Sequence, residues 1–493
     1  MPLRLFNTLS GKIEEFRPLV DNEVRMYACG PTVYDYGHIG NFRTFVAVDI
    51  LRRYLRQSGH KLHHVMNITD VDDKIIRNAA QAGVNVQQYT AKYQKAFLED
   101  AAALHIEEPQ ITRATEHIAQ MAEFIARLVE KGFAYKTEDG SYYFRIAKFP
   151  GYGKLSKRDF AGMEDGADVD VDDYEKDNAR DFALWKAPKA GEASWESVIG
   201  PGRPGWHIEC SVMSMQELGE SFDLHAGGED LIFPHHENEI AQSESLTGKQ
   251  FAHFWFHARF LLVEGEKMSK SAGNFFTLRD LVLKGHKPSS IRYLLASVPY
   301  RHQLNFTFEG LQQAAASVER LRNFRLRLSG NFPDGSSLAM TSLAQETSRR
   351  LRESLDDDLN TAQAQAAIFD MARATNAAID AAEIKKEDVS PLLAALDQFD
   401  EIFSVLKDDD AEKMQQIAEW AASDGREKDI NPSLLDVVRS AALSGDQINQ
   451  KLEQMKAARA GKKYAESDAI RAELTAAAII IEQTKEGVRW RRK

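Results

Sequence analysis

Hydrophobic positions in the first seventy residues alternate between two periods. Residues 24–29 are apolar and rich in β-forming types, residues 42–55 carry apolar side chains at helical spacing, and residues 62–68 predict a further strand. Asp70 is expected to cap a helix that begins near Val71. This strand–helix–strand order predicts a parallel sheet with right-handed crossovers, the centre of an α/β fold.

The pattern continues downstream and then changes. Helices are predicted at 86–104, 117–131 and 234–247, a hairpin at 135–147 turning at Asp139-Gly140, an acidic exposed loop at 163–178 and a strand at 222–225. From about residue 308 to 406 the chain is rich in Ala, Leu and Arg at helical spacing, which predicts a helical bundle. Residues 408–410 are interpreted as a linker, and a last helical unit is expected from 432 to the end.

These changes divide the chain into an interrupted α/β unit and two smaller units. A chain of 493 residues has room for three or four units of about 150 residues each. The expected divisions are 1–115 and 201–307 for the two halves of the α/β domain, 116–200 for an inserted connective subdomain, 308–410 for the bundle and 430–493 for the C-terminal domain.

Composition narrows the class of protein. The longest apolar run, residues 476–481, is far shorter than the roughly 20 residues of a membrane-spanning helix. The N-terminus lacks the apolar core of a signal peptide, so a cytoplasmic location is expected. The net charge is −12, yet residues 451–493 hold 11 Lys/Arg and 6 Asp/Glu, which gives +5. A basic tail on an acidic body suits local binding of a polyanion, and equally a solvated terminal helix.

The first candidate site lies where the strand at 24–29 runs into residues 30–41, Gly-Pro-Thr-Val-Tyr-Asp-Tyr-Gly-His-Ile-Gly-Asn. A glycine-rich turn from strand to helix directs backbone N–H groups and the positive end of a helix at a bound anion. His38 and Asn41 add side-chain donors, and Gly40 lets a flat ring approach the backbone. Taken alone, the segment is more simply a glycine-rich turn.

A second candidate is Lys-Met-Ser-Lys-Ser at 267–271, which Gly265 and Gly273 flank. Lys267 and Lys270 can neutralise the charge of a departing pyrophosphate. An isolated segment of this kind is more often a solvated turn, but the ordered pair within one α/β domain favours a phosphate site. The pair resembles the signature sequences of class I aminoacyl-tRNA synthetases, His-Ile-Gly-His and Lys-Met-Ser-Lys-Ser, with Asn41 in place of the last histidine.

A candidate metal site involves both cysteines of the chain, Cys29 and Cys210, which are too few for a disulfide scaffold. His235 and Glu239 are four residues apart and would share a helix face. Two thiolates, an imidazole and a carboxylate favour zinc over magnesium or calcium. Spacing alone does not separate this set from a solvated His–Glu pair. The neighbouring alternatives are His207, His236 and Glu237.

Three segments, residues 29–35, 205–211 and 233–239, resemble the zinc-site segments of cysteinyl-tRNA synthetases. The resemblance implies one zinc ion per chain, bound by Cys29, Cys210, His235 and Glu239. It also implies that zinc selects the thiol of the substrate. Serine differs from cysteine by one atom, and shape alone separates such pairs by only about 1–3 kcal/mol. Zinc prefers a thiolate to an alcohol.

The same resemblance implies the other site residues. They are His38, Asn41, Lys267 and Lys270 for catalysis; Thr69, Trp206 and His225 for cysteine; Gly40, Gly228, Asp230, Met268 and Lys270 for ATP; and Arg489, Trp490 and Arg491 for tRNA. Without the resemblance, Thr69 is as readily a helix cap, Trp206 a packed aromatic and the C-terminal end a disordered basic tail.

The resulting prediction is an α/β class I synthetase catalytic domain with an inserted subdomain, a helical bundle and a small anticodon-binding domain. The implied reaction is activation of L-cysteine by ATP with Mg²⁺ and transfer to the 3′ end of tRNA-Cys, in a monomer. Two alternatives remain. One is a related enzyme that joins cysteine to an amino-sugar and needs no basic C-terminal unit. The other is a degenerate synthetase that only binds tRNA, which Asn41 favours.

Overall fold

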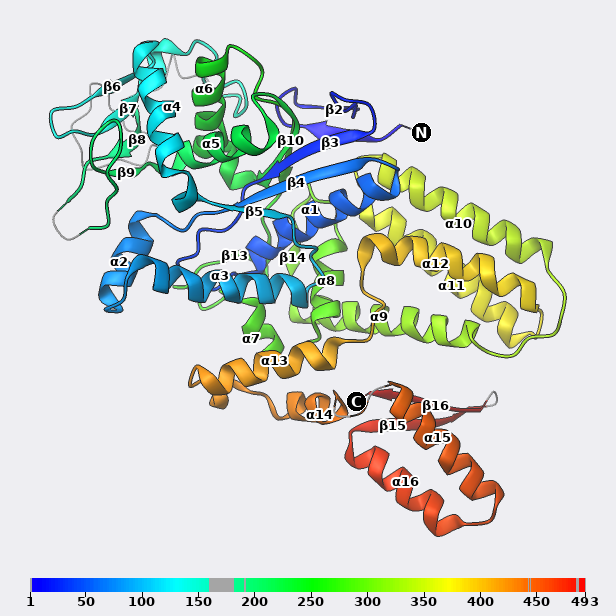
Figure 1. Cartoon of the computed structure of the whole chain (residues 1–493). Helices are drawn as coiled ribbons and strands as arrows, with labels where there is room; N and C mark the ends of the chain where they lie inside the picture. Colours follow the sequence, from blue (N-terminus) through cyan, green and yellow to red (C-terminus); the bar gives the residue numbers. More distant parts are fainter. Residues whose placement is uncertain are drawn as a thin grey trace.

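The computed structural model describes residues 2–158, 181–189, 192–441, 443, 445–484 and 487–492. The loop predicted at 163–178 lies outside these residues. Figure 1 shows an α/β unit, a helical bundle beside it and a small unit at the C-terminal end. Among the described helices, none is both long and apolar enough to cross a membrane.

A five-stranded parallel sheet forms the centre of the α/β unit (Figure 1). Its strands lie in the spatial order β11 (Ala252–Ala258), β10 (Phe222–Gly228), β3 (Glu23–Ala28), β4 (Lys61–Ile68) and β5 (Gln110–Arg113). The chain runs outward from β3 to β4 and β5, then returns to the other side of β3 as β10 and β11. Strand order therefore reverses between β3 and β10, and open parallel sheets bind their ligands at the carboxyl ends of strands at such a point.

Successive side chains of β3 face opposite sides of the sheet and join two separate cores. Val24, Met26 and Ala28 pack in the larger core with residues of α1 (Ile39–Gln57), whereas Tyr27 and Cys29 belong to the second. That second core also holds residues of α4 (Ile118–Glu130), α5 (Trp206–Leu218) and α6 (Glu237–Thr247). The two-residue period of the strand therefore turns Cys29 toward the face that α5 and α6 cover.

Most predicted elements of the α/β unit are confirmed within a few residues, including α3 (Val86–Ala103) and the hairpin of β6 (Ala134–Lys136) and β7 (Tyr142–Phe144). Two helices of this unit begin later than predicted. Helix α2 (Asp73–Gln81) begins later than predicted, with Asp72 as its N-cap. Asp70 cannot serve as that cap because its carboxylate accepts hydrogen bonds from the backbone N–H and the hydroxyl of Thr115, at 2.9 and 2.6 Å.

The helix predicted at 234–247 also starts three residues late. A residue that precedes proline is driven out of the helical region, and Phe233 before Pro234 is indeed extended, with φ −140° and ψ 132°. Ile232–His236 therefore form a kinked turn, and α6 begins at Glu237. His235 lies in this turn, yet its Nε2 is still 3.1 Å from Oε1 of Glu239.

The chain between β5 and β10 forms a small antiparallel sheet beside α4. Its strands follow the order β6, β7, β8 (Phe182–Lys186) and β9 (Arg203–Pro204). After β11 the α/β unit is completed by short elements. They are β12 (Leu262–Val263), β13 (Glu266–Lys267), α7 (Leu278–Leu283), α8 (Pro288–Ala296) and β14 (Asn305–Phe306), and β1 (Arg4–Asn7) pairs with β2 (Lys12–Glu15) near the N-terminus.

The predicted bundle consists of α9 (Phe308–Leu328), α10 (Leu338–Asp356), α11 (Thr361–Asp380) and α12 (Val389–Phe403). The segment at 408–410, interpreted as a linker, is held firmly in place. Asp410 begins α13 (Asp410–Ser423) and is buried, and its carboxylate accepts hydrogen bonds from the backbone N–H and the hydroxyl of Ser289 at 2.8 and 2.6 Å. A buried carboxylate needs such partners, so the segment joins the bundle to α8.

The C-terminal unit contains α14 (Pro432–Ala441), α15 (Gly445–Ala460) and α16 (Tyr464–Ala476). The expectation of a helical unit to the end is wrong, because β15 (Ile479–Thr484) and β16 (Gly487–Arg492) form an antiparallel hairpin. β-Branched residues at 479–481 favour a strand. The alternative of a disordered tail is wrong for residues 487–492. The Trp490 indole N–H donates to Oδ1 of Asn449 on α15 at 2.7 Å.

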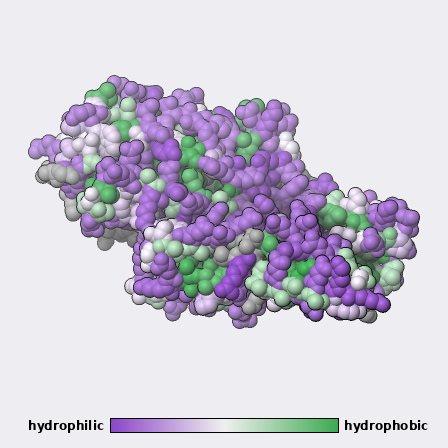
Figure 2. Space-filling view, turned by 60° about the horizontal axis from the view of Figure 1, so that its bottom comes forward, coloured by the Kyte–Doolittle hydropathy of each residue, from purple (hydrophilic) through white to green (hydrophobic). Residues whose placement is uncertain are grey.

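Large hydrophobic side chains at the surface are scattered. The face in Figure 2 is mainly hydrophilic, with hydrophobic residues in small groups. Leu19, Val198, Phe260 and Leu338 are exposed and come from different parts of the chain. Single exposed hydrophobic residues are normal in folded proteins. Most of the large hydrophobic side chains are buried in the cores.

Arg292 of α8 joins the α/β unit to the bundle. Its guanidinium is fully buried, donates to the Asp49 carboxylate of α1 at 2.6 Å, and donates to the carbonyl oxygens of Leu104 and Ile402 at 2.8 and 3.3 Å. Burial alone would raise the pKa of Asp49, but the charges of Arg292 and Arg53 hold it below its usual value. The ion pair therefore lies within the α/β unit, and the hydrogen bond to Ile402 of α12 joins it to the bundle.

We expect Arg292→Ala to destabilise the protein by about 3–5 kcal/mol, because it leaves the buried Asp49 carboxylate without its main partner. Thermal unfolding followed by circular dichroism should show a melting temperature several degrees lower. Arg349→Ala on α10 is the matched control, since Arg349 pairs with Glu346 and Glu353 at the surface. Equal melting temperatures for the Arg292 variant and the parent would contradict this account.

Candidate active site

Four predicted ligand residues meet between the end of β3 and helices α5 and α6. Cys29 follows β3, Cys210 lies in α5, His235 precedes α6, and Glu239 lies in its first turn; all four side chains are buried. The Cys29 sulfur is 3.6 Å from the Cys210 sulfur and 3.6 Å from Oε1 of Glu239. The four potential ligand atoms lie within 4.8 Å of one another, so this group could hold a metal ion.

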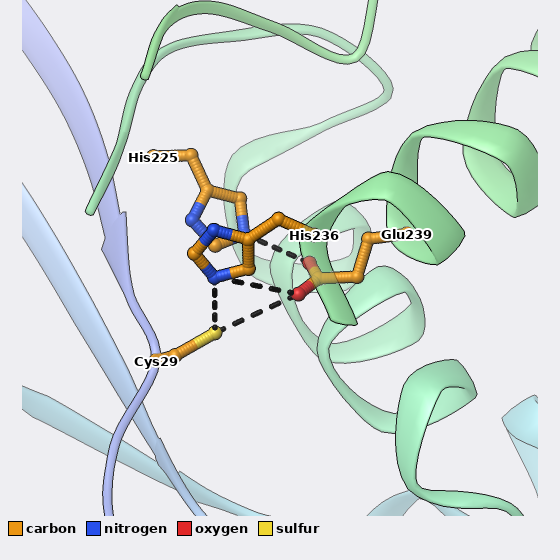
Figure 3. A group of neighbouring side chains, drawn as sticks. All are labelled: Cys29, His225, His236 and Glu239. Atoms are coloured by element: carbon orange, nitrogen blue, oxygen red, sulfur yellow. Dashed lines mark hydrogen bonds and ion pairs between the residues drawn. The ribbon is translucent and has the colours of Figure 1, made fainter. Parts of the chain in front are cut away.

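A second group shares two of these residues and is drawn in Figure 3. It combines Cys29 and Glu239 with His225 of β10 and His236, and its potential ligand atoms also lie within 4.8 Å of one another. Nε2 of His236 is 3.3 Å from the Cys29 sulfur, and Nε2 of His225 is 2.8 Å from Oε2 of Glu239. The buried cluster therefore offers two overlapping sets of donors.

The other alternative ligands have different roles. The Glu237 carboxylate accepts hydrogen bonds from the backbone N–H groups of Leu155 and Ser156 at 3.1 and 2.8 Å, so it holds the inserted subdomain against α6. Nδ1 of His207 lies 3.0 Å from Nδ1 of His235 and supports that ring. Of the three alternatives considered from sequence, His236 alone enters a candidate metal group of the described residues.

Two further residues support the cluster and were not found from sequence. Nδ1 of His236 is 2.8 Å from Nε2 of His257 on β11, and Nδ1 of His257 is 2.8 Å from the hydroxyl of Thr8. This chain of contacts orients the His236 ring toward Cys29. The pairing of β11 with β10 brings His257 close to His236. The residues around His257 in the sequence carry no pattern that predicts this contact.

The cluster retains negative charge despite its burial. Burial raises the pKa of the Cys29 thiol well above its usual value, and the hydrogen bond with Cys210 adds to this. Burial also acts to raise the pKa of Cys210, but hydrogen bonds with Cys29 and His235 lower it to about 6. At Glu239, His225 and His235 overcome the effect of burial and lower the pKa to about 2. A thiolate and a carboxylate at neutral pH favour a bound cation.

The residues expected to contact cysteine surround this cluster. The hydroxyl of Thr69, just after β4, donates to Oε2 of the buried Glu209 at 2.7 Å. Trp206 begins α5, is 37% exposed, and stacks on His235 with 4.1 Å between ring centroids. Glu209 was missed from sequence, although it adjoins Cys210 in the same segment. The partly exposed Trp206 therefore packs directly on a buried member of the cluster.

His38 and Asn41 form a reciprocal cap at the start of α1. The backbone N–H of Asn41 donates to Nδ1 of His38, and the backbone N–H of His38 donates to Oδ1 of Asn41, both at 3.1 Å. Burial, and then the charge of Lys270, lower the pKa of His38 to about 4. His38 is therefore neutral at physiological pH, and asparagine at position 41 has a structural role in the cap.

The lysine-containing loop lies directly against this turn. A Cβ atom at Gly40 would be 3.2 Å from Cε of Met268 and 3.0 Å from the His38 ring, so the glycine permits the contact. The backbone N–H of Ile39 donates to the carbonyl of Phe276 at 3.0 Å. Lys270 Nζ donates to the Asp35 carboxylate at 2.6 Å. The two predicted phosphate segments are therefore neighbours.

The remaining predicted residues lie in other elements. Gly228 ends β10, and Asp230 follows it so closely that a Cβ atom on Gly228 would lie 2.4 Å from Oδ1 of Asp230. Lys267 lies in β13 and is exposed. Arg489, Trp490 and Arg491 lie in β16, within the C-terminal unit rather than the α/β unit.

Comparison with known families identifies the class. A family model described as tRNA synthetases class I (C) catalytic domain matches residues 15–316, and one described as DALR domain matches residues 350–407, which include the C-terminal end of α10 and all of α11 and α12. A methionyl-tRNA synthetase of Mycobacterium tuberculosis has the same fold, with a TM-score of 0.55 and 16% identity over 86% of this chain and 95% of that one. Fold and site together define a class I aminoacyl-tRNA synthetase.

Two similar proteins identify the family within this class. The chain is 66% identical over 495 aligned residues to a cysteine–tRNA ligase of Koribacter versatilis, covering 100% of both chains. It is 53% identical to a cysteine–tRNA ligase of Solibacter usitatus, again over 100% of both. This protein belongs to the cysteine–tRNA ligase family.

A pair of substitutions on α6 tests the metal cluster. Glu239→Gln removes a charged donor common to both candidate groups, so we expect the bound divalent metal to be lost after dialysis. Glu237→Gln is the matched control, because that buried carboxylate binds the backbone of the inserted subdomain, and it should retain the metal. Elemental analysis of the purified proteins gives the ratio of metal to protein. Equal ratios in the two variants would argue against the cluster.

Metal affinity should fall as the pH falls. Cys29, whose pKa is raised, and His235, whose pKa rises to about 10 because Glu239 outweighs the effect of burial, must release protons to bind a metal. Below about pH 6 Cys210 also holds its proton, so the decline should steepen by about tenfold per pH unit. Competition with a chromophoric chelator from pH 5 to 8 measures this. A constant affinity over that range would refute it.

Proposed function

We propose that this protein activates L-cysteine with ATP to form cysteinyl-adenylate and then transfers the cysteinyl group to the 3′ end of tRNA-Cys. The observation that carries the proposal is the buried group of two thiols, an imidazole and a carboxylate beside Thr69 and Trp206, at the reversal point of the sheet. Its occurrence in a chain 66% identical to a cysteine–tRNA ligase supports this substrate. A monomer in the cytoplasm is part of the same proposal.

Zinc fits the donors of the cluster. Cys29, Cys210, His235 and Glu239 would hold it, because sulfur and nitrogen donors favour zinc over magnesium or calcium. His225 would then orient the Glu239 carboxylate from outside the ligand set, as hydrogen-bonded partners of metal ligands commonly do. When bound, zinc would distinguish a thiolate from the hydroxyl of serine.

The neighbouring side chains would complete the cysteine pocket. The Thr69 hydroxyl donates to Glu209 and accepts from the Asn67 amide at 3.1 Å, so the remaining lone pair of its oxygen points in a defined direction. Trp206, stacked on His235, would cover the substrate and exclude water. His225 would line the base of the pocket.

The two phosphate segments would bind Mg²⁺-ATP across the same edge of the sheet. The start of α1 supplies His38 and Asn41, Gly40 and Gly228 allow close approach, Met268 would contact the adenine, and Asp230 would accept a hydrogen bond from the ribose. The cysteine carboxylate attacks the α-phosphate and pyrophosphate leaves. Because His38 is neutral, positive charge for the leaving group comes from Lys267 and Lys270.

The second step would use the helical and C-terminal units. The ribose hydroxyl at the 3′ end of tRNA attacks the activated carbonyl, and AMP leaves. The anticodon would be read by residues 430–493, where Arg489, Trp490 and Arg491 lie in β16. A basic strand with an aromatic residue can hold phosphate and stack a base. The hydrogen bond from Trp490 to Asn449 ties this strand to α15.

Charging of unfractionated bacterial tRNA with labelled cysteine, with serine in large excess, tests the proposal. We expect cysteine to be attached and serine not to displace it. Cys210→Ser should lose zinc and lower charging by more than the roughly 10–100-fold typical of losing a residue outside the ligand set. Full charging by a metal-free Cys210→Ser protein would refute the zinc assignment. Absence of charging by folded, zinc-loaded protein would refute the tRNA reaction itself.

A further inference from the structure

The loop lysine Lys270 has an ionic partner that the two signature segments do not include. Its Nζ donates to Oδ2 of Asp35 at 2.6 Å, and this hydrogen bond raises the pKa of Lys270. The lysine side chain is 67% exposed and the aspartate 37% exposed. The ammonium also lies 5.1 Å from the centroid of the Phe275 ring, whose edge contacts His38. Asp35 thus holds the lysine near the turn that carries His38.

Asp35 itself is held in place by its neighbour Tyr36. Its other oxygen, Oδ1, accepts a hydrogen bond from the backbone N–H of Tyr36 at 2.8 Å. The Tyr36 ring packs edge-on against Tyr93 of α3 and Trp420 of α13, each with 5.2 Å between centroids, and its hydroxyl donates to Asp424 at 3.3 Å. The carboxylate therefore belongs to a segment that two helices anchor.

The loop that carries Lys270 is stabilised mainly by short-range contacts. The Asn274 side chain accepts from the backbone N–H of Ser269 at 2.8 Å and donates to the carbonyl of Lys267 at 3.2 Å. These bonds shape the turn but do not contact the Lys270 ammonium. A long lysine side chain has many rotamers, so the bond to a fixed carboxylate defines its position.

We propose that Asp35 is a positioning residue, which holds the Lys270 ammonium where the phosphates of ATP are bound. The inference rests on the proposed role of Lys270. An ammonium group has three N–H donors, so Lys270 can keep its bond to Asp35 while two donors remain for phosphate oxygens. Asp35 contacts no reacting atom in this scheme and acts through the lysine.

A stabilising surface ion pair would give different behaviour from a positioning pair. Exposed lysine–carboxylate pairs contribute little to stability, so loss of Asp35 should leave the melting temperature unchanged. Loss of positioning instead lowers the rate of adenylate formation, because the ammonium samples many rotamers when pyrophosphate leaves. The rate effect should also require Lys270.

The test measures cysteine-dependent pyrophosphate exchange by the zinc-loaded full chain. Asp35→Asn should lower kcat about tenfold, with KM for ATP changed by less than about twofold, and Asp35→Glu should recover most of the rate. In a Lys270→Ala background, Asp35→Asn should cause no further loss. Transfer of cysteine from preformed adenylate to tRNA should be unaffected. Glu220→Gln, which breaks the exposed pair with Lys249, is the matched control and should leave every value unchanged.

Each contrary result has a distinct meaning. An unchanged or faster Asp35→Asn enzyme, with Lys270→Ala impaired, overturns the inference and leaves the proposed function intact. If Asp35→Asn lowers kcat by the same factor in the parent and in the Lys270→Ala enzyme, the inference is also overturned, since Asp35 would then act independently of the lysine. An unimpaired Lys270→Ala enzyme would instead contradict the proposed role of Lys270, on which the inference depends.

Discussion

The parallel pairing of β3 with β10 on one side and β4 on the other is the constraint on which the site depends. It places the carboxyl ends of three strands side by side, although β10 lies some two hundred residues from β3 in sequence. Cys29, Thr69 and His225 are carried on or just beyond these strands. Helices α5 and α6 then pack on the same face and bring Cys210 and Glu239 to Cys29.

Burial makes this polar cluster costly unless its members have partners, and each candidate ligand residue has at least one, although Nδ1 of His225 has none among the described residues. Glu239 pairs with two imidazoles, His236 contacts both Cys29 and His257, and Glu209 accepts from Thr69. The same contacts orient the side chains that would hold zinc. The second core and the metal cluster are therefore built from the same elements.

The two halves of the proposed site differ in exposure, and the difference suits the chemistry proposed for each half. Selection of a thiol needs donors fixed in a dry environment, and the Cys–His–Glu cluster is buried. Exchange of ATP and pyrophosphate needs access, and the loop around Lys270 is exposed. The contacts of Met268 with Gly40 and of Lys270 with Asp35 connect this loop to the start of α1, so the exposed half is still ordered.

The sequence by itself determined the α/β pattern and the bundle, and it predicted two phosphate segments and the residue types of a metal site, because periodicity and short motifs are local properties. Tertiary structure decided which donors meet. It drew Glu237 to the inserted subdomain, brought His236 and His257 to the cluster, and paired Asp70 with Thr115 rather than with the start of α2. It also formed the terminal hairpin. These outcomes depend on packing between distant segments, since a buried polar group takes whichever partner the fold places within reach.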